Sequence, residues 1–222
     1  MELLRDDVVT CRACPRLVTW REDVARTKRA AFADDDYWGR PIPGFGDPDA
    51  RVVILGLAPA AHGANRTGRV FTGDRSGDFL YASLHRTGFA SQPHAHHRDD
   101  GLVLTGAYVT AAVRCAPPAN RPTPAERDAC FPFLLRELAL LRRVRVVVPL
   151  GQFAYDALAR ALATQGRPLP RPRPRFGHGV EVAFDGGTVV CSFHPSQQNT
   201  FTGKLTEEMI DAVFVRAALL AG

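Results

Sequence analysis

Four short apolar runs, rich in β-branched residues, recur along the chain. They span residues 52–55, 107–113, 144–150 and 188–193, and Arg145 is the only charged residue in them. A run that stays apolar, instead of alternating with polar residues, is typical of a strand buried on both faces of a parallel sheet. The pattern therefore predicts four buried parallel strands.

Segments with helical periodicity lie between and after these runs. In one of them, Thr123, Pro124 and Glu126 have the spacing of an N-cap residue, a first-turn proline and a capping-box glutamate. Gly88 suits the left-handed conformation that often follows the last turn of a helix. The segments expected to be helical are 78–86, 123–142, 152–163 and 206–220.

The alternation of strands and helices predicts an α/β fold. Because right-handed crossovers place helices on both faces of a parallel sheet, we expect a three-layer α/β/α sandwich around a four-stranded, mainly parallel sheet. A chain of 222 residues is long enough to bury one core without disulfide support. We therefore expect a single domain over residues 1–222, in which residues 1–50 form an N-terminal segment.

The least regular sequence follows directly after the predicted strands. These loops span residues 56–74, 114–121, 151–152 and 194–203. Ligands of open α/β sheets bind outside the carboxyl ends of the strands, which is where all four loops are expected to meet. The sequence thus predicts one ligand cleft at this edge.

Composition narrows the chemistry of the cleft. The net charge is +5, which is compatible with a polyanionic partner, although an arginine-rich genome would give the same excess. Lys28 and Lys204 are the only lysines, so a Schiff-base mechanism is disfavoured. The acidic start of the chain and the lack of a membrane-length apolar run predict a cytoplasmic protein without a membrane partner.

Five cysteines raise the question of a metal centre. Cys11 and Cys14 form a C-x-x-C-P element, and Cys115 and Cys130 provide a widely spaced second pair. Four thiolates in a cytosolic chain indicate metal ligands, and the wide spacing favours an iron–sulfur cluster over a zinc ribbon. The alternative is that they are ordinary buried cysteines, which is how we interpret Cys191 in the last predicted strand.

Three of the loop motifs together resemble a known family. They are the segment 56–68 with Phe71-Thr72-Gly73-Asp74, the segment 111–122, and His194-Pro195-Ser196-Gln197-Gln198-Asn199-Thr200. In order and content they resemble the family 5 (type b) uracil-DNA glycosylases, and the cysteine spacing is similar to that of the iron–sulfur members. The resemblance implies a 4Fe-4S cluster on the four cysteines Cys11, Cys14, Cys115 and Cys130.

The resemblance also implies an activity, which is hydrolysis of the N-glycosidic bond of uracil in DNA during base excision repair. Such an enzyme flips the nucleotide out of the stack and holds its base. Phe71 is then the stacking platform, unless it only anchors its loop. His194 is the donor that holds charge on the leaving base, unless it is structural.

Attack by water requires a polar group, and the segment 57–61 offers none. By resemblance, Asp74 and Asn120 are the catalytic candidates that direct water and offset charge on the sugar. Asp74 is equally suited to cap the following helix, and Asn120 among prolines is equally suited to end a turn. The sequence leaves both alternatives open.

The remaining substrate-binding candidates concern base recognition. Gly56, Leu57, Ala58, Ala111 and Asn199 occupy motif positions that the resemblance assigns to the substrate site. Related branches have an asparagine where this chain has Ala111, which implies weaker discrimination among bases. We therefore expect DNA with uracil, and with other deaminated bases such as hypoxanthine, as the partner of a monomer.

Two loops have competing interpretations. Residues 197–204 are expected to enter the minor groove with Phe201 as a wedge, or else to form a polar loop before the last helix. The histidines at 94, 96 and 97 are expected to lie in a solvated loop, not at a metal. The rival functions are a nucleic-acid-binding module without catalysis and a nucleotide hydrolase, for which the chain lacks the phosphate-loop lysine.

Overall fold

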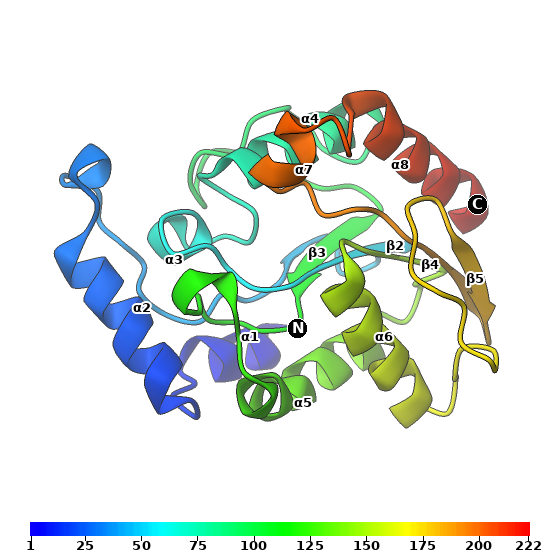
Figure 1. Cartoon of the computed structure of the whole chain (residues 1–222), viewed down its shortest axis with the longest axis horizontal. Coiled ribbons are helices and arrows are strands. Elements are labelled where there is room, and N and C mark those ends of the chain that lie inside the picture. Colours follow the sequence, from blue (N-terminus) through cyan, green and yellow to red (C-terminus); the bar gives the residue numbers. More distant parts are fainter.

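A six-stranded sheet with the order β1-β3-β2-β4-β6-β5 forms the centre of the computed structural model, which describes residues 1–222 (Figure 1). Its four inner strands are mutually parallel, and the two edge strands run antiparallel to their neighbours. The strands are β1 (Phe45–Gly46), β2 (Val52–Gly56), β3 (Ala107–Ala111), β4 (Val146–Pro149), β5 (Glu181–Phe184) and β6 (Gly187–Val190). The predicted α/β class and its four parallel strands are confirmed, and the strand count is corrected from four to six.

Both faces of the sheet are covered, which explains the uninterrupted apolar runs. Val52 and Ile54 of β2 belong to the core under one helical layer, whereas Val53 and Leu55 belong to the core under the other. Every residue of β2, β3 and β4 is buried. A strand buried on both faces gains no advantage from polar alternation.

The helices form two layers, with α4 and α8 over one face of the sheet and α5 and α6 over the other (Figure 1). None combines the length and apolar character needed to cross a bilayer. Short 3-10 turns occur at Ala30–Phe32 and Pro118–Asn120. The helices are α1 (Glu2–Val9), α2 (Pro15–Thr27), α3 (Ala64–Thr67), α4 (Arg75–Arg86), α5 (Pro124–Leu140), α6 (Gln152–Thr164), α7 (Gln197–Phe201) and α8 (Glu207–Ala221).

The predicted helix signals operate as expected. The Thr123 hydroxyl accepts a hydrogen bond from the Glu126 amide, and the Glu126 carboxylate accepts one from the Thr123 amide, which completes the capping box of α5. Gly88 has a φ of +84° after the end of α4. The helices that correspond to the four predicted segments are α4, α5, α6 and α8.

Residues 1–50 contribute the edge strand β1 to the sheet and pack beside it through α1 and α2. Arg136 of α5 pairs with Asp7 of α1 at 2.7 Å. The Arg16 guanidinium of α2 donates to both carboxylate oxygens of Glu126, each at 2.7 Å. Proline at the first position starts α2 directly after Cys14, so the two cysteines of the C-x-x-C-P element lie between the two helices.

Candidate active site

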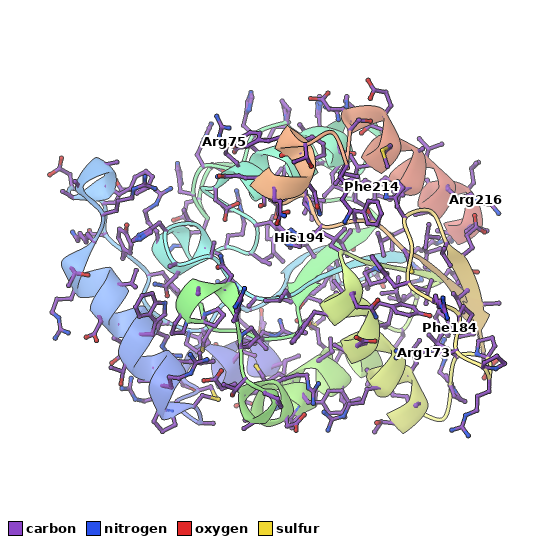
Figure 2. The ribbon with its side chains drawn as sticks, in the orientation of Figure 1. Arg75, Arg173, Phe184, His194, Phe214 and Arg216 are labelled. Carbon is purple, nitrogen blue, oxygen red and sulfur yellow. The ribbon has the colours of Figure 1, made fainter.

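A cleft opens at the carboxyl end of the sheet, between the loops that follow β2, β3 and β6. Figure 2 labels two residues of its lining, His194 after β6 and Arg75 at the start of α4 (Arg75–Arg86). The short loop after β4 does not line it, which corrects the expectation that all four loops would do so. The lining residues are Leu57, Ala58, Pro59, Ala60, Val70, Phe71, Asp74, Arg75, Ser76, Asn120, His194, Ser196, Gln197 and Gln198.

Asp74 is both a helix cap and part of the cleft wall. One carboxylate oxygen accepts a hydrogen bond from the Gly77 amide at 3.0 Å, at the first turn of α4. The other oxygen lies against Gly63, where an added Cβ would come within 2.1 Å of it. Burial raises the pKa of Asp74, and the amides of Gly77 and Ser76 oppose this shift. The capping role is therefore confirmed, and it leaves the Asp74 carboxylate in the wall of the cleft.

His194 follows the last parallel strand and faces the cleft with an imidazole that has no hydrogen-bond partner within the chain. Burial lowers the pKa of His194 from 6.5 to about 4. The ring is therefore neutral at pH 7 and can donate a single N–H. Its main-chain position is fixed by Asn199, whose side-chain amide donates to the His194 carbonyl at 2.8 Å.

Phe71 lies beside His194, with the two ring centroids 5.8 Å apart and the planes tilted by 35°. The Phe71 ring packs directly on Gly56, where an added Cβ would come within 2.6 Å of a ring carbon. Gly56 therefore provides the space that lets the aromatic ring reach the end of β2. Phe71 itself has a φ of +50°, which is unusual for a residue with a side chain.

Asn120 closes the cleft from the loop after β3. It is exposed and has a φ of +55°, and the preceding Ala119 has a φ of +52°. Asparagine tolerates this left-handed conformation, whereas alanine adopts it at a cost of roughly 1 kcal/mol. Four non-glycine residues of the chain have a positive φ, and three of them lie on the loops that form the cleft: Phe71, Ala119 and Asn120. Strained backbone of this kind clusters at functional sites.

Several predicted substrate residues lie elsewhere or act indirectly. Leu57 and Ala58 line the cleft, but Ala111 does not: it is buried at the end of β3, where it pairs with Gly56. Asn199 is also absent from the lining and supports the backbone of His194. The strand end hides Ala111 because its side chain belongs to the core under α4 and α8.

Two arginines that the sequence reasoning missed hold the first motif in place. Arg69 is almost fully buried and donates to both oxygens of Asp100, at 2.8 and 2.6 Å. Arg66 donates to the carbonyls of His62 and Gly73 at 2.9 and 3.0 Å. A paired, buried arginine gives no signal in the sequence that separates it from a solvated one. These contacts fix the loop that carries Phe71 and Asp74.

Arg75 and Phe201 meet at the mouth of the cleft. The Arg75 guanidinium lies 5.0 Å from the centroid of the Phe201 ring. Phe201 is 66% exposed at the end of α7, whose first turn is capped by the Ser196 hydroxyl. An exposed aromatic ring beside a cleft is a candidate contact for a flat partner.

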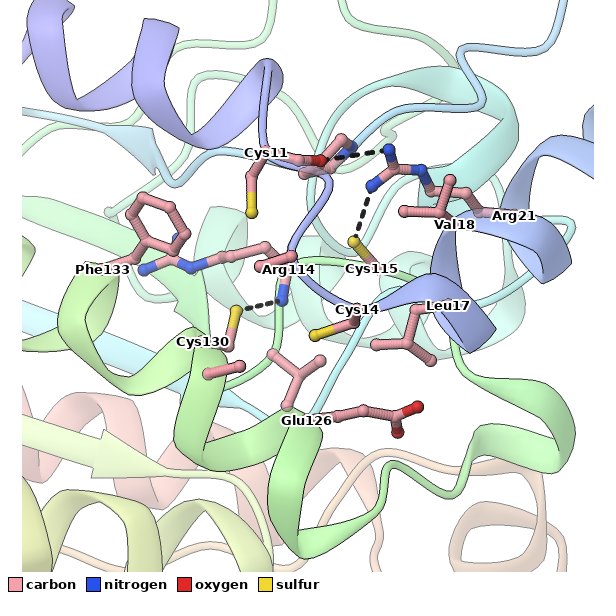
Figure 3. Close-up of a pocket in the computed structure, with 14 residues that line it drawn as sticks. Cys11, Cys14, Leu17, Val18, Arg21, Arg114, Cys115, Glu126, Cys130 and Phe133 are labelled. Atoms are coloured by element: carbon pink, nitrogen blue, oxygen red, sulfur yellow. Dashed lines mark hydrogen bonds between the residues drawn. The ribbon is translucent and has the colours of Figure 1, made fainter.

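The four cysteines outside the sheet line a single pocket. In Figure 3 the sulfurs of Cys11, Cys14, Cys115 and Cys130 approach the same space from the N-terminal segment, the loop after β3 and helix α5. The Arg114 amide donates to the Cys130 sulfur at 3.2 Å. Cys191 is buried in the core under α5 and α6, as expected.

The donors of this pocket are not grouped around a single ion. No set of three or more histidine, cysteine or acidic side chains in the structure is arranged to hold one metal ion. The histidines at 94, 96 and 97 likewise form no group that could hold a metal ion, and all three are exposed. The cysteine pocket is lined mostly by apolar side chains, among them Leu17, Val18, Val113 and Phe133. It therefore offers thiols in a largely dry setting.

Comparison with known proteins finds consistent similarity. The model of the uracil DNA glycosylase superfamily matches residues 43–217. A type-5 uracil-DNA glycosylase of Mycobacterium tuberculosis is 54% identical over 97% of this chain and 80% of its own length. Its counterpart in Thermus thermophilus is 53% identical over 97% of this chain and 95% of its own length. The type-5 enzyme of Pyrobaculum aerophilum is 44% identical over 97% of this chain and 91% of its own length.

Proposed function

The chain belongs to the uracil DNA glycosylase superfamily, and we propose that its cleft hydrolyses the bond between uracil and deoxyribose in DNA, as a monofunctional enzyme of base excision repair. The observation that carries this proposal is the meeting of Phe71, Asp74, Asn120 and His194 around one cleft. Three separate loops supply them, each after a parallel strand.

Recognition of the base uses the Phe71 and His194 pair. A uracil flipped out of the duplex stacks on the Phe71 ring, which is held at the strand end by its contact with Gly56. The neutral imidazole of His194 donates its N–H to an oxygen of the base. This hydrogen bond strengthens as negative charge develops on the leaving base, so it favours the transition state over the substrate.

Attack on the sugar uses the opposite side of the cleft. The Asp74 carboxylate accepts a hydrogen bond from water and offsets the positive charge that develops on the sugar. The Asn120 amide orients the water without acting as a base. Neither lysine lines the cleft, so no amine is available there for a covalent adduct with the abasic sugar.

The range of bases is expected to be broad. The segment 57–60 and Val70 present an apolar wall, which holds no polar side chain to read the edge of the base. Rejection of a wrong base depends on polar groups that it would leave unpaired. We therefore propose that hypoxanthine in DNA is also a substrate.

We further propose that Cys11, Cys14, Cys115 and Cys130 hold a 4Fe-4S cluster. Support comes from the four cysteines that line one pocket and from its largely apolar lining. A cluster places iron and sulfide between the thiolates and so needs a wider cradle than zinc. When bound, it would cross-link the N-terminal segment to the loop after β3 and to α5.

The four residues assigned to the reaction meet within a single copy of the chain, without a partner's residue, and we propose that a monomer is active, in the cytoplasm. The test is a panel of duplexes that each carry one lesion. We expect release of uracil and hypoxanthine and alkali-sensitive breaks, without trapping of the protein on DNA by borohydride. Tight binding of the duplexes without base release would favour the rival binding module.

The cluster is tested by purifying the protein anaerobically and measuring its bound iron and its absorption at about 400 nm.

A further inference from the structure

Arg21 is a buried cation that contacts the cysteine pocket. Its side chain is 2% exposed on helix α2. One guanidinium nitrogen donates to the Cys115 sulfur at 2.9 Å, and another donates to the Cys11 carbonyl at 3.1 Å (Figure 3). Arg21 thus touches both halves of the proposed ligand set.

The charge of Arg21 is poorly compensated by the protein itself. The nearest carboxylate, that of Glu22, lies 3.8 Å from the guanidinium and is 44% exposed. The Arg21 Nε is buried without a hydrogen-bond partner. A buried cation is stable only beside an anionic partner. Thiolates around a cluster would provide that negative charge on the side that Arg21 faces.

The backbone of Arg21 continues the connection toward the cleft. The side-chain amide of Asn65 donates to the Arg21 carbonyl at 3.1 Å, and Asn65 is 1% exposed. Asn65 belongs to α3, which begins directly after Gly63. Gly63 is the residue against which the Asp74 carboxylate rests. The contacts from Cys115 to Asp74 therefore run through Arg21, Asn65 and Gly63.

We propose that Arg21 is a positioning residue that joins the cluster to the cleft. Its guanidinium hydrogen-bonds the Cys115 thiolate and stabilises the negative charge of the cluster, while its carbonyl holds Asn65 and thereby the seat of Asp74. This inference rests on the proposed function and on the proposed cluster. It assigns a role to two buried side chains that take no part in the reaction itself.

The experiment compares Arg21→Met, Arg21→Lys and Asn65→Leu with wild type. Each protein is purified anaerobically and examined for iron content, cluster absorption, reduction potential and kcat/KM for uracil in duplex DNA. Hydrogen bonds to ligand sulfurs set the potential of a cluster. We expect Arg21→Met to lower the potential and Arg21→Lys, which keeps the charge, to restore part of it.

The Asn65 variant separates the two links. Asn65→Leu leaves the Cys115 contact intact, so we expect an unchanged potential together with a roughly tenfold fall in kcat/KM. Arg26→Met, on the exposed side of the same helix, is the control and should change neither quantity. If Arg21→Met fails to fold, Arg21→Lys and Asn65→Leu still test the potential and the rate separately.

The outcomes distinguish the role of Arg21 from the two proposals on which it depends, the uracil-releasing activity and the cluster. The role of Arg21 would be overturned if Arg21→Met and Asn65→Leu both kept the wild-type reduction potential and the wild-type kcat/KM. The proposed function would still stand in that case, provided that the wild type releases uracil. If the reduction potential shifted in Arg21→Met but no form of the protein released uracil, the contact between Arg21 and the cluster would be supported and the proposed activity refuted. Wild-type protein without iron would overturn both the cluster and the role of Arg21.

Discussion

Phe71 and His194 lie side by side in the cleft, with their ring centroids 5.8 Å apart and their planes tilted by 35°. Their loops follow β2 and β6, two parallel strands separated by β4. The proposed stacking surface for the base and the proposed N–H donor are therefore positioned by the same sheet. Because both loops leave strand ends that are buried and hydrogen-bonded, neither group needs to be ordered when DNA binds.

Replacement of His194 by alanine should lower the rate of base release about 100-fold or more, because a preorganised donor to the leaving group is lost. The fold should persist, since the imidazole makes no hydrogen bond within the chain. Single-turnover release of uracil measures the rate, and thermal unfolding checks the fold. His97→Ala, in an exposed loop, is the control and should match the wild type. A wild-type rate in His194→Ala would refute the role.

The pH dependence of kcat/KM should show no titration near pH 6.5. The pKa of His194 is lowered to about 4 by burial, so the imidazole stays neutral down to that pH. Burial raises the pKa of Asp74, so its carboxylate takes up a proton at a higher pH than a solvent-exposed aspartate would. We expect kcat/KM of the wild type to fall in acid as this proton is taken up. That acid limb should be missing from the residual activity of Asp74→Asn.

The same shift of His194 predicts how stability depends on pH. Between about pH 4 and pH 6.5 the unfolded chain binds a proton at this residue that the folded chain does not. The free energy of unfolding therefore rises with pH through this window. Urea unfolding at several pH values should show a shallower rise in His194→Ala than in the wild type. Equal slopes would mean that the folded imidazole titrates normally.

Gly63→Ala should impair catalysis more than it impairs folding. The added methyl group would lie 2.1 Å from a carboxylate oxygen of Asp74 and must displace it. A displacement of about 1 Å at a reacting group reduces rates by up to about 100-fold. Gly88→Ala is the control, since no atom lies within 4 Å but its φ is +84°. It should lower the unfolding free energy by about 1 kcal/mol and leave kcat/KM unchanged.

Phe201→Ala should weaken the handling of duplex DNA more than that of single strands. A side chain that wedges into the base stack is needed only where a stack must be opened. We expect kcat/KM for uracil in duplex to fall about tenfold and that for a single strand to change little. Leu219→Ala on α8, which is 71% exposed, is the matched control. Equal losses on both substrates would remove the wedge interpretation.

The strands and long helices could be predicted because a parallel sheet with two covers imposes a long apolar run on each inner strand. The edge strands β1 and β5 could not be predicted in this way. Strand β1 has only two residues, and β5 has only four, which alternate between exposed and buried and so contain no apolar run. Helix α2 has buried residues at helical spacing, but one of them is Arg21, whose burial depends on contacts from three other segments.

The site could be predicted in its chemistry but not in its geometry. Motif order identified Phe71, Asp74, Asn120 and His194, which the structure brings together. The same motifs did not reveal that Ala111 lies in the core, because the sequence does not show on which side of a strand end a small residue points. For a related reason, the sequence could not decide between the two alternatives for Asp74. A capping carboxylate and a cleft carboxylate have the same sequence signature.

Residues 1–42 lie outside the stretch that matches the superfamily, yet they supply two of the four thiols and Arg21. A polypeptide trimmed to that stretch would retain every residue that lines the cleft. It would lose the Arg21 carbonyl that anchors α3 and the Arg16 pair at the start of α5. We therefore expect a fragment limited to residues 43–217 to be less stable and less active than the full chain, because contacts from residues 1–42 hold α3 and the start of α5.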